Sequence, residues 1–205
     1  MIKNIIFDLG NVIIDILPQK TYEAFATLSN KYSWQEIEQL IKEKKLWIGY
    51  ETGHFTDAEF RDLIRKELSI SASDEAIDLA FNALLLEIDP KRIELIENLG
   101  RKYRLFILSN TSNIHFVDVE KILERCTGRK HFSDFIEIVF LSYEMGKVKP
   151  DPEIYRQVLQ DAGIIAEETL FVDDLQANVE SAAKLGINII HIQPPVGILE
   201  RLKEY

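Results

Sequence analysis

Short runs of apolar, often β-branched residues alternate along the chain with longer stretches in which apolar residues recur at helical spacing. The runs cover residues 3–7, 103–108, 135–141, 169–172 and 187–192. Most are apolar at consecutive positions, which is typical of parallel strands buried on both faces of a sheet. Because strands that alternate with helices form right-handed crossovers, the order predicts an α/β fold, a doubly wound, Rossmann-like parallel sheet of five core strands.

Several of the helical stretches have recognisable ends. An Asp-Pro pair at residues 89–90, and another at residues 151–152, places an N-cap carboxylate before a proline in the first turn. The two helices that these pairs begin should end at Gly100 and Gly163, because glycine readily adopts the backbone conformation that follows a helix.

A long segment without a strand-like run follows the first predicted strand. From residue 17 to residue 88 the pattern is helical and is interrupted by turn signals, one of which is the sequence YETGH at residues 50–54. Thr56 and Glu59 form a capping box at the start of the next helix. We therefore predict two domains: an α/β core of residues 1–16 and 89–205, and an inserted α-helical cap of residues 17–88.

Composition and charge limit the partners of the chain. Its 205 residues contain 34 acidic and 24 basic side chains and carry a formal net charge of −10. Such an excess repels phosphate backbones, so neither nucleic acid nor an anionic membrane is an expected partner. The single Cys126 cannot form an internal disulfide, and no apolar run approaches the ~18 residues of a membrane span. We expect a cytoplasmic protein that is a monomer or a weak homodimer.

Polar side chains stand at the carboxyl ends of four predicted strands. The first strand ends in Asp8 and the second in Ser109-Asn110, Lys149 follows the third, and the fourth ends in Asp173-Asp174. Because ligands bind beyond the carboxyl ends of the strands in an open parallel sheet, these residues should line one crevice. We expect Asp8 to be exposed there, without a partner in the core.

The charges of this set favour a metal ion. Three carboxylates and one lysine leave two negative charges in a partly desolvated crevice, which is unfavourable unless a cation enters. Oxygen ligands suit Mg²⁺, and once it is bound the Ser109 hydroxyl and Lys149 can donate to an anion that Asp8 attacks. Phosphoryl transfer through an aspartyl-phosphate would follow. Asp173 and Asp174 could instead cap the helix that follows them.

Read together, these strand ends resemble the haloacid dehalogenase-like superfamily of hydrolases. The matching motifs are FDLGNV at residues 7–12, LSNT at 108–111, Lys149-Pro150 and VDD at 172–174. The resemblance covers essentially the whole chain, and it implies that the helical insert is a mobile cap. The resemblance also implies roles for single residues. Asp8 would be the nucleophile, Ser109 and Asn110 would hold the phosphoryl group, and Lys149 would bridge nucleophile and phosphate. Asp8, the Gly10 carbonyl and Asp174 would hold Mg²⁺ directly, and Asp173 would hold it through water.

One position departs from the family pattern. Phosphatases of the superfamily usually carry a second Asp, which protonates the leaving group, where this chain has Gly10. In this respect the motif is similar to that of bacterial sugar-phosphate phosphatases such as α-D-glucose-1-phosphate phosphatase. Either Glu51 or His54 of the turn at residues 50–54 supplies the proton, or the substrate has a good leaving group, as in anomeric and aryl phosphates. We therefore expect activity on anomeric or aryl phosphates well above that on primary-alcohol phosphates.

Three functions remain open at this point. The leading hypothesis is a Mg²⁺-dependent phosphatase of small phosphorylated metabolites, with sugar phosphates the best candidates. A catalytically silent relative that acts as a binding protein is the second. A metal-independent 2-haloacid dehalogenase is the third, and the acidic pair at residues 173–174 argues against it because that chemistry needs no metal.

Overall fold

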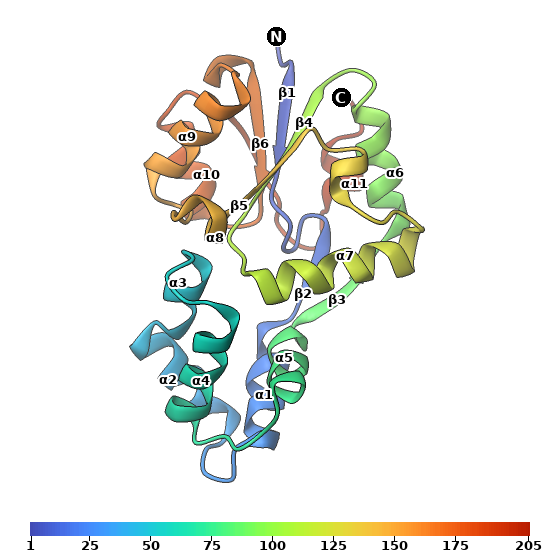
Figure 1. The fold of residues 1–205 in the computed structure, drawn as a ribbon. Helices are drawn as coiled ribbons and strands as arrows, with labels where there is room; N and C mark the ends of the chain where they lie inside the picture. Colours follow the sequence, from blue (N-terminus) through green and yellow to red (C-terminus); the bar gives the residue numbers. More distant parts are fainter.

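A five-stranded parallel sheet forms the centre of the core domain (Figure 1). The computed structural model describes residues 1–205. The strands, in their spatial order, are β5 (Ile138–Leu141), β4 (Arg104–Ser109), β1 (Asn4–Phe7), β6 (Thr169–Asp173) and β7 (Asn188–His191). Every neighbouring pair is parallel. The prediction of a doubly wound α/β sheet with five core strands is therefore confirmed.

Helices cover both faces of this sheet, which explains why its strands are apolar at consecutive positions. Within β1, Ile5 and Phe7 belong to the apolar cluster on one face, and Ile6 to the cluster on the other. The first face is covered by α6 (Pro90–Leu99), α7 (Asn113–Thr127) and α11 (Ile198–Arg201), and the second by α9 (Pro152–Ala162) and α10 (Gln176–Ala183). A short helix, α8 (Ser142–Met145), follows β5 directly, and 3₁₀ turns occupy Phe132–Asp134 and Ala166–Glu168.

The predicted helix ends are confirmed for the two Asp-Pro pairs. The Asp89 carboxylate accepts a hydrogen bond from the main-chain N–H of Lys91 at 2.9 Å, and Asp151 accepts one from Glu153 at 2.9 Å. Each bond satisfies one of the N–H groups that a helix leaves free at its start. None of the helices combines the length and the apolar character that crossing a membrane requires.

Five helices form the cap, below the sheet in Figure 1. They are α1 (Pro18–Leu28), α2 (Trp34–Lys44), α3 (Leu46–Glu51), α4 (Asp57–Leu68) and α5 (Asp74–Asn82). The cap has its own apolar cluster, in which the buried ring of Tyr50 stacks on Phe60 with 4.1 Å between ring centroids. The capping box of Thr56 and Glu59 is present.

The turn predicted over residues 50–54 is wrong in its first half. Tyr50 and Glu51 belong to α3, and the chain turns only from Thr52 onward. The reason is tertiary packing, because the Tyr50 ring is buried in the cap cluster and holds this last turn of the helix in place.

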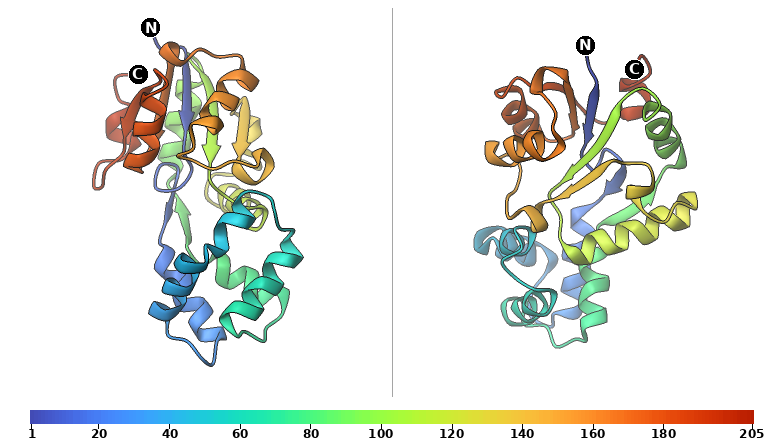
Figure 2. Two further views of the ribbon diagram at one scale, coloured as in Figure 1. Left: turned by 90° about the vertical axis from the view of Figure 1, so that its left-hand side faces the viewer. Right: turned by 45° about the horizontal axis from the view of Figure 1, so that its top comes forward.

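Two short strands that the hydrophobic pattern did not predict connect the cap to the core. They are β2 (Ile14–Ile16) and β3 (Leu85–Ile88), which pair in antiparallel fashion, and Figure 2 shows the ribbon that they form. The expectation of no strand between residues 17 and 88 is therefore wrong at β3. Strands of this length are too short to show an alternating pattern, and their pairing joins segments about seventy residues apart. Both predicted domain boundaries lie at the ends of this ribbon.

The cap also contacts the first turn of α7, which lies between the two domains in Figure 1. The Tyr50 hydroxyl donates to Asp57 Oδ1 at 2.7 Å and accepts from the main-chain N–H of Ile114 at 3.2 Å. Asn113 Nδ2 donates to the other oxygen of Asp57 at 2.8 Å. Two donors at the start of this core helix, the Ile114 N–H and the Asn113 amide, thus bond to side chains of the cap.

His115 makes a second contact between α7 and the cap. Its Nδ1 lies 2.8 Å from Asn82 Oδ1, and its ring stacks on Phe81 with 3.7 Å between centroids. Burial lowers the pKa of His115 from its ordinary 6.5 to about 3, so the ring is neutral in the folded protein near neutral pH.

This shift predicts acid sensitivity. A histidine whose pKa is lowered by folding stabilises the fold above pH 6.5, and that contribution is lost as the pH falls and the unfolded chain takes up the proton. Between pH 7.5 and pH 5.0 the loss should reach about 2 kcal/mol. Urea unfolding at both pH values should show a smaller difference for His115→Gln, because glutamine cannot be protonated. An equal difference in both proteins would contradict this.

Candidate functional site

A buried lysine lies between two carboxylates at the carboxyl ends of β1 and β6. Lys149 Nζ is 2.8 Å from Asp8 Oδ1 and 2.8 Å from Asp173 Oδ2, and it donates to the main-chain carbonyl of Leu108 at 2.9 Å. The exposed fraction is 7% for Asp8, 4% for Lys149 and 0% for Asp173. The expectation that Asp8 is exposed and unpartnered is therefore wrong. Its main-chain N–H still bonds to Val172, so the residue belongs to the sheet and its side chain meets Lys149.

Asn110 holds the main chain of this lysine. Its Nδ2 donates to the Lys149 carbonyl at 2.9 Å, and its Oδ1 accepts from the Lys149 N–H at 2.8 Å. The resemblance gave Asn110 to the phosphoryl group, whereas here both ends of its amide are engaged with Lys149. The neighbouring Lys147 bonds instead to Gln157 on α9.

Both oxygens of Asp173 accept hydrogen bonds from groups inside the protein. Oδ1 accepts from the main-chain N–H of Leu175 at 2.8 Å, and the Nδ2 atom of Asn178 lies 3.0 Å from each oxygen. With Lys149 on Oδ2, this carboxylate anchors the lysine and the start of α10 together. Asn178 was missed by the sequence analysis, since no motif marks an asparagine within the helix.

Asp174 is placed differently. It is half-buried, and its Oδ2 accepts one hydrogen bond, from Asn11 Nδ2 at 2.9 Å. Its main-chain carbonyl accepts from His191 Nε2 on β7 at 2.9 Å. Asn11, which precedes β2, was also missed by the sequence analysis.

The three aspartates fit a hard divalent cation. Asp8, Asp173 and Asp174 each offer an oxygen, and these atoms lie within 4.8 Å of one another. Burial raises the pKa of Asp8 from 3.8 to about 7, and burial together with the charge of Asp173 raises the pKa of Asp174. The set contains three carboxylates and one ammonium, so a bound Mg²⁺ would offset the remaining negative charge and stabilise the ionised set.

Ser109 ends β4, the strand next to β1, and is 4% exposed. Gly10 lies two residues after Asp8, between β1 and β2. A Cβ atom at Gly10 would lie 3.1 Å from Cδ1 of Ile16, so a larger residue there requires the end of the Ile16 side chain to shift by a few tenths of an ångström.

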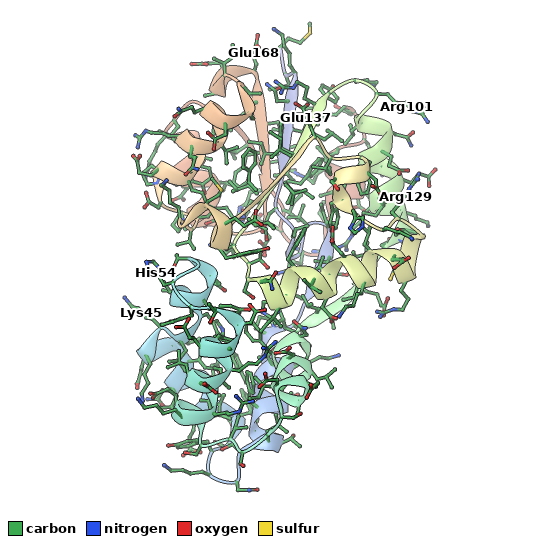
Figure 3. The ribbon with its side chains drawn as sticks, in the orientation of Figure 1. Lys45, His54, Arg101, Arg129, Glu137 and Glu168 are labelled. Atoms are coloured by element: carbon green, nitrogen blue, oxygen red, sulfur yellow. The ribbon has the colours of Figure 1, made fainter.

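The cap turn meets the core at α8. Gly53 has a φ of +71°, and a Cβ there would lie 2.2 Å from the carbonyl oxygen of Tyr143, so only glycine fits. Glu51 is half-buried, and burial raises its pKa to about 7. His54 is exposed at the outer edge of the cap, where its Nδ1 lies 2.7 Å from Thr52 Oγ1 (Figure 3). The structure thus places Glu51, but not His54, in a desolvated setting.

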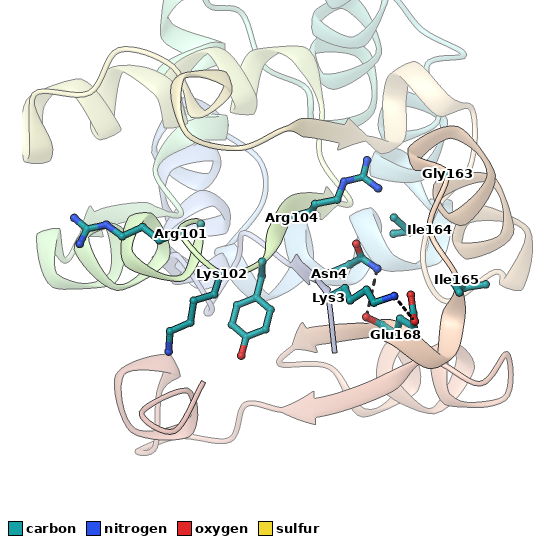
Figure 4. A pocket seen from close by; sticks show the side chains of 11 residues that line it. Lys3, Asn4, Arg101, Lys102, Arg104, Gly163, Ile164, Ile165 and Glu168 are labelled. Carbon is teal, nitrogen blue, oxygen red and sulfur yellow. Dashed lines mark hydrogen bonds and ion pairs between the residues drawn. The ribbon is translucent and has the colours of Figure 1, made fainter. Parts of the chain in front are cut away.

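A cavity of about 470 Å³ lies at the opposite end of the sheet (Figure 4). Although it is lined by basic residues, Lys3 pairs with Glu168 at 2.7 Å, and Arg104 pairs with Glu137 and donates to the last carbonyl of α9. These cations offset nearby carboxylates and helix C-termini. The carboxylate cluster at the other end therefore remains the candidate site.

Comparison with known proteins agrees with this geometry. Residues 2–186 match the haloacid dehalogenase-like hydrolase family. The chain is 34% identical over 198 residues to D-ribitol-5-phosphate phosphatase of Bacteroides thetaiotaomicron, covering 91% of this chain and 89% of that one. It is 28% identical over 203 residues to glyceraldehyde 3-phosphate phosphatase of Pyrococcus abyssi, covering 93% and 81%.

A solved structure has the same fold throughout. It is a haloacid dehalogenase-like (HAD) family enzyme of Bacteroides thetaiotaomicron in complex with magnesium and inorganic phosphate. The TM-score is 0.90 and the sequence identity is 35%, and the match covers 99% of this chain and 100% of that one.

The charge arrangement predicts that two substitutions change the stability of the metal-free protein differently. Lys149→Met leaves two buried carboxylates without a countercharge and should lower the free energy of unfolding by ~3–5 kcal/mol. Asp8→Asn should not lower it at pH 8, because a carboxyl whose pKa is raised to about 7 destabilises the fold once it is ionised. Chemical denaturation in EDTA measures both. Equal destabilisation by the two variants would refute this account of the charges.

Proposed function

Since the chain belongs to the haloacid dehalogenase-like hydrolase family and is a magnesium-dependent phosphoric monoester hydrolase, we propose that Asp8 is its nucleophile and that its substrates are small polyol and sugar phosphates. The observation that carries the assignment is the buried Lys149 between Asp8 and Asp173, with Asp174 beside them. The named activities of the two relatives support small phosphate esters with the phosphate on a terminal carbon.

The first step uses groups that are already in place. Lys149 holds Asp8 Oδ1 at 2.8 Å, which leaves the other oxygen of that carboxylate to attack phosphorus. The ester P–O bond breaks, and the leaving oxygen takes a proton and departs as the alcohol. Asp8, Asp174 and the Gly10 carbonyl would hold Mg²⁺, with Asp173 acting through water and through Lys149. The bound metal would neutralise the charge of the carboxylates and of the phosphoryl oxygens.

The second step restores the enzyme. A water molecule attacks the phosphorus of the aspartyl-phosphate and gives a proton to the Glu51 carboxylate left by the first step. The bond between phosphorus and the Asp8 oxygen breaks, and Asp8 is released as a carboxylate together with inorganic phosphate. Ser109, at the end of the neighbouring strand, is assigned to hold the phosphoryl oxygens in both steps, and the nearby positive charge of Lys149 would stabilise them. Asn110 contributes through the lysine that it holds.

The proton of the first step needs a source other than residue 10. We assign it to Glu51, because burial raises its pKa to about 7 and part of it is therefore protonated near neutral pH. Glu51 lies in the last turn of α3, and the turn after α3 contacts α8 of the core. This assignment allows turnover of primary-alcohol phosphates, for which the sequence analysis expected slow reaction.

The remaining proposals concern the setting of the enzyme. The net charge of −10 supports a protein without nucleic acid or membrane partners. We place it in the cytoplasm as a monomer or weak homodimer.

A phosphate-release panel tests the assignment of Asp8. With millimolar Mg²⁺, wild type should hydrolyse D-ribitol 5-phosphate and glyceraldehyde 3-phosphate, and Asp8→Asn should lower kcat by roughly 10³-fold or more because the nucleophile is lost. Asp161→Asn, a change in an exposed carboxylate on α9, is the matched control and should leave kcat unchanged. More than a tenth of the wild-type rate in Asp8→Asn would exclude Asp8 as nucleophile. No release by wild type from any ester would favour a silent binding protein, and halide release from 2-chloropropionate in EDTA a dehalogenase.

The contact between residue 10 and the ribbon gives a second test. Ile16→Val removes the Cδ1 atom that lies 3.1 Å from a Cβ at position 10, so the double variant Gly10→Asp/Ile16→Val can accommodate the missing acid. General acid catalysis is typically worth ~10²–10⁴-fold, so the added Asp should raise kcat most where Glu51 is replaced by Gln. The comparison is Glu51→Gln with and without the double change, and Ile16→Val alone is the control. An unchanged kcat of Glu51→Gln on alkyl phosphates, with p-nitrophenyl phosphate as reference, would remove Glu51 as the proton donor.

A further inference from the structure

Asn11 lies between the carboxylate cluster and the ribbon that leads to the cap. Its Nδ2 donates to Asp174 Oδ2 at 2.9 Å, and its Oδ1 accepts from the main-chain N–H of Ile16 at 3.2 Å. Its own N–H donates to the carbonyl of Ile14 at 2.7 Å. The half-buried side-chain amide thus connects Asp174 to the last residue of β2, and the main-chain N–H of Asn11 bonds to the first.

The backbone at this position is unusual for a residue with a side chain. Asn11 has a φ of 54°, in the left-handed region that glycine adopts without steric cost. Asparagine tolerates this region better than most residues but is still less comfortable there than glycine. A side chain at such a position indicates that its contacts offset the steric cost. The contacts of this side-chain amide are its hydrogen bonds with Asp174 and with the N–H of Ile16.

We propose that Asn11 is a positioning residue that orients Asp174 toward the metal and ties that carboxylate to the ribbon. The proposal rests on the proposed function, in which Asp174 holds Mg²⁺. By donating to Oδ2, Asn11 fixes the rotation of the carboxylate and leaves Oδ1 free for the ion. His191 holds the main-chain carbonyl of the same residue, so the ligand is fixed from β7 as well.

The second bond of the amide extends this link to the cap. Ile16 is the last residue of β2, and the chain continues from there into α1. Its N–H depends on Asn11 Oδ1, so the ordering of Asp174 by Mg²⁺ also orders the end of the ribbon. Because coupling between two sites is reciprocal, a ribbon held in this position favours metal binding to the same extent.

Asn11→Gly tests the proposal because it removes both hydrogen bonds of the side-chain amide and also removes the steric cost of a positive φ. Partners of metal ligands typically contribute 10–100-fold in affinity, so titration calorimetry with Mg²⁺ should show a Kd raised by about that factor. The melting temperature in EDTA should stay equal or rise. Ser69→Gly is the matched control: Ser69 has the same φ of 54° at an exposed position of the cap, and its substitution should leave the Kd for Mg²⁺ unchanged.

Hydrogen exchange supplies a readout other than affinity. In wild type, Mg²⁺ should slow exchange of the Ile16 N–H, and in Asn11→Gly this effect should be lost even at saturating Mg²⁺. An unchanged Kd in Asn11→Gly, when Asp174→Asn abolishes binding, would overturn the role of Asn11 and leave the metal site intact. If wild type binds no Mg²⁺, or if its Kd for Mg²⁺ equals that of Asp174→Asn, the proposed metal site and the role of Asn11 are both overturned.

Discussion

The buried Lys149 ammonium and the carboxylates around it are the constraint on which the site depends. A single positive charge lies between Asp8 and Asp173, and Asp174 adds a third carboxylate within reach of the same ion. Burying such a set without full neutralisation is costly, and burial raises the pKa of Asp8. The site therefore favours a divalent cation, and with it an anionic substrate whose phosphorus lies next to Asp8.

Many contacts of the core serve to keep this lysine in place. Asn110 fixes its main chain, the Leu108 carbonyl accepts from its ammonium, and Asn178 holds the far carboxylate. These residues come from β4, from the segment after it and from α10, so the geometry of the charges depends on the correct assembly of the sheet. Removing Lys149 from this arrangement would leave the buried carboxylates without a countercharge, so the lysine also contributes to the stability of the fold.

The sequence predicted the frame of the molecule better than the details of the site. The five strands were identifiable because both faces of the sheet are covered, and the strand-end residues were identifiable because the carboxyl ends of parallel strands meet. The ribbon of β2 and β3 was missed because its strands have three and four residues and pair across the whole cap. The burial of Asp8 and the actual partner of Asn110 depend on a lysine that is far away in the sequence, and no local pattern reveals such contacts. Asn11 and Asn178 were missed for the same reason.

Trapping the covalent intermediate tests the central claim most directly. Wild type mixed with Mg²⁺ and substrate, quenched in acid and reduced with borohydride, should yield homoserine at position 8, because reduction of an aspartyl-phosphate converts that side chain to an alcohol. Peptide mass spectrometry would detect the loss of the carboxyl oxygen at this residue and at no other aspartate. Turnover of the substrate with an unmodified Asp8, or with the modification at Asp173 or Asp174, would contradict the assignment of the nucleophile.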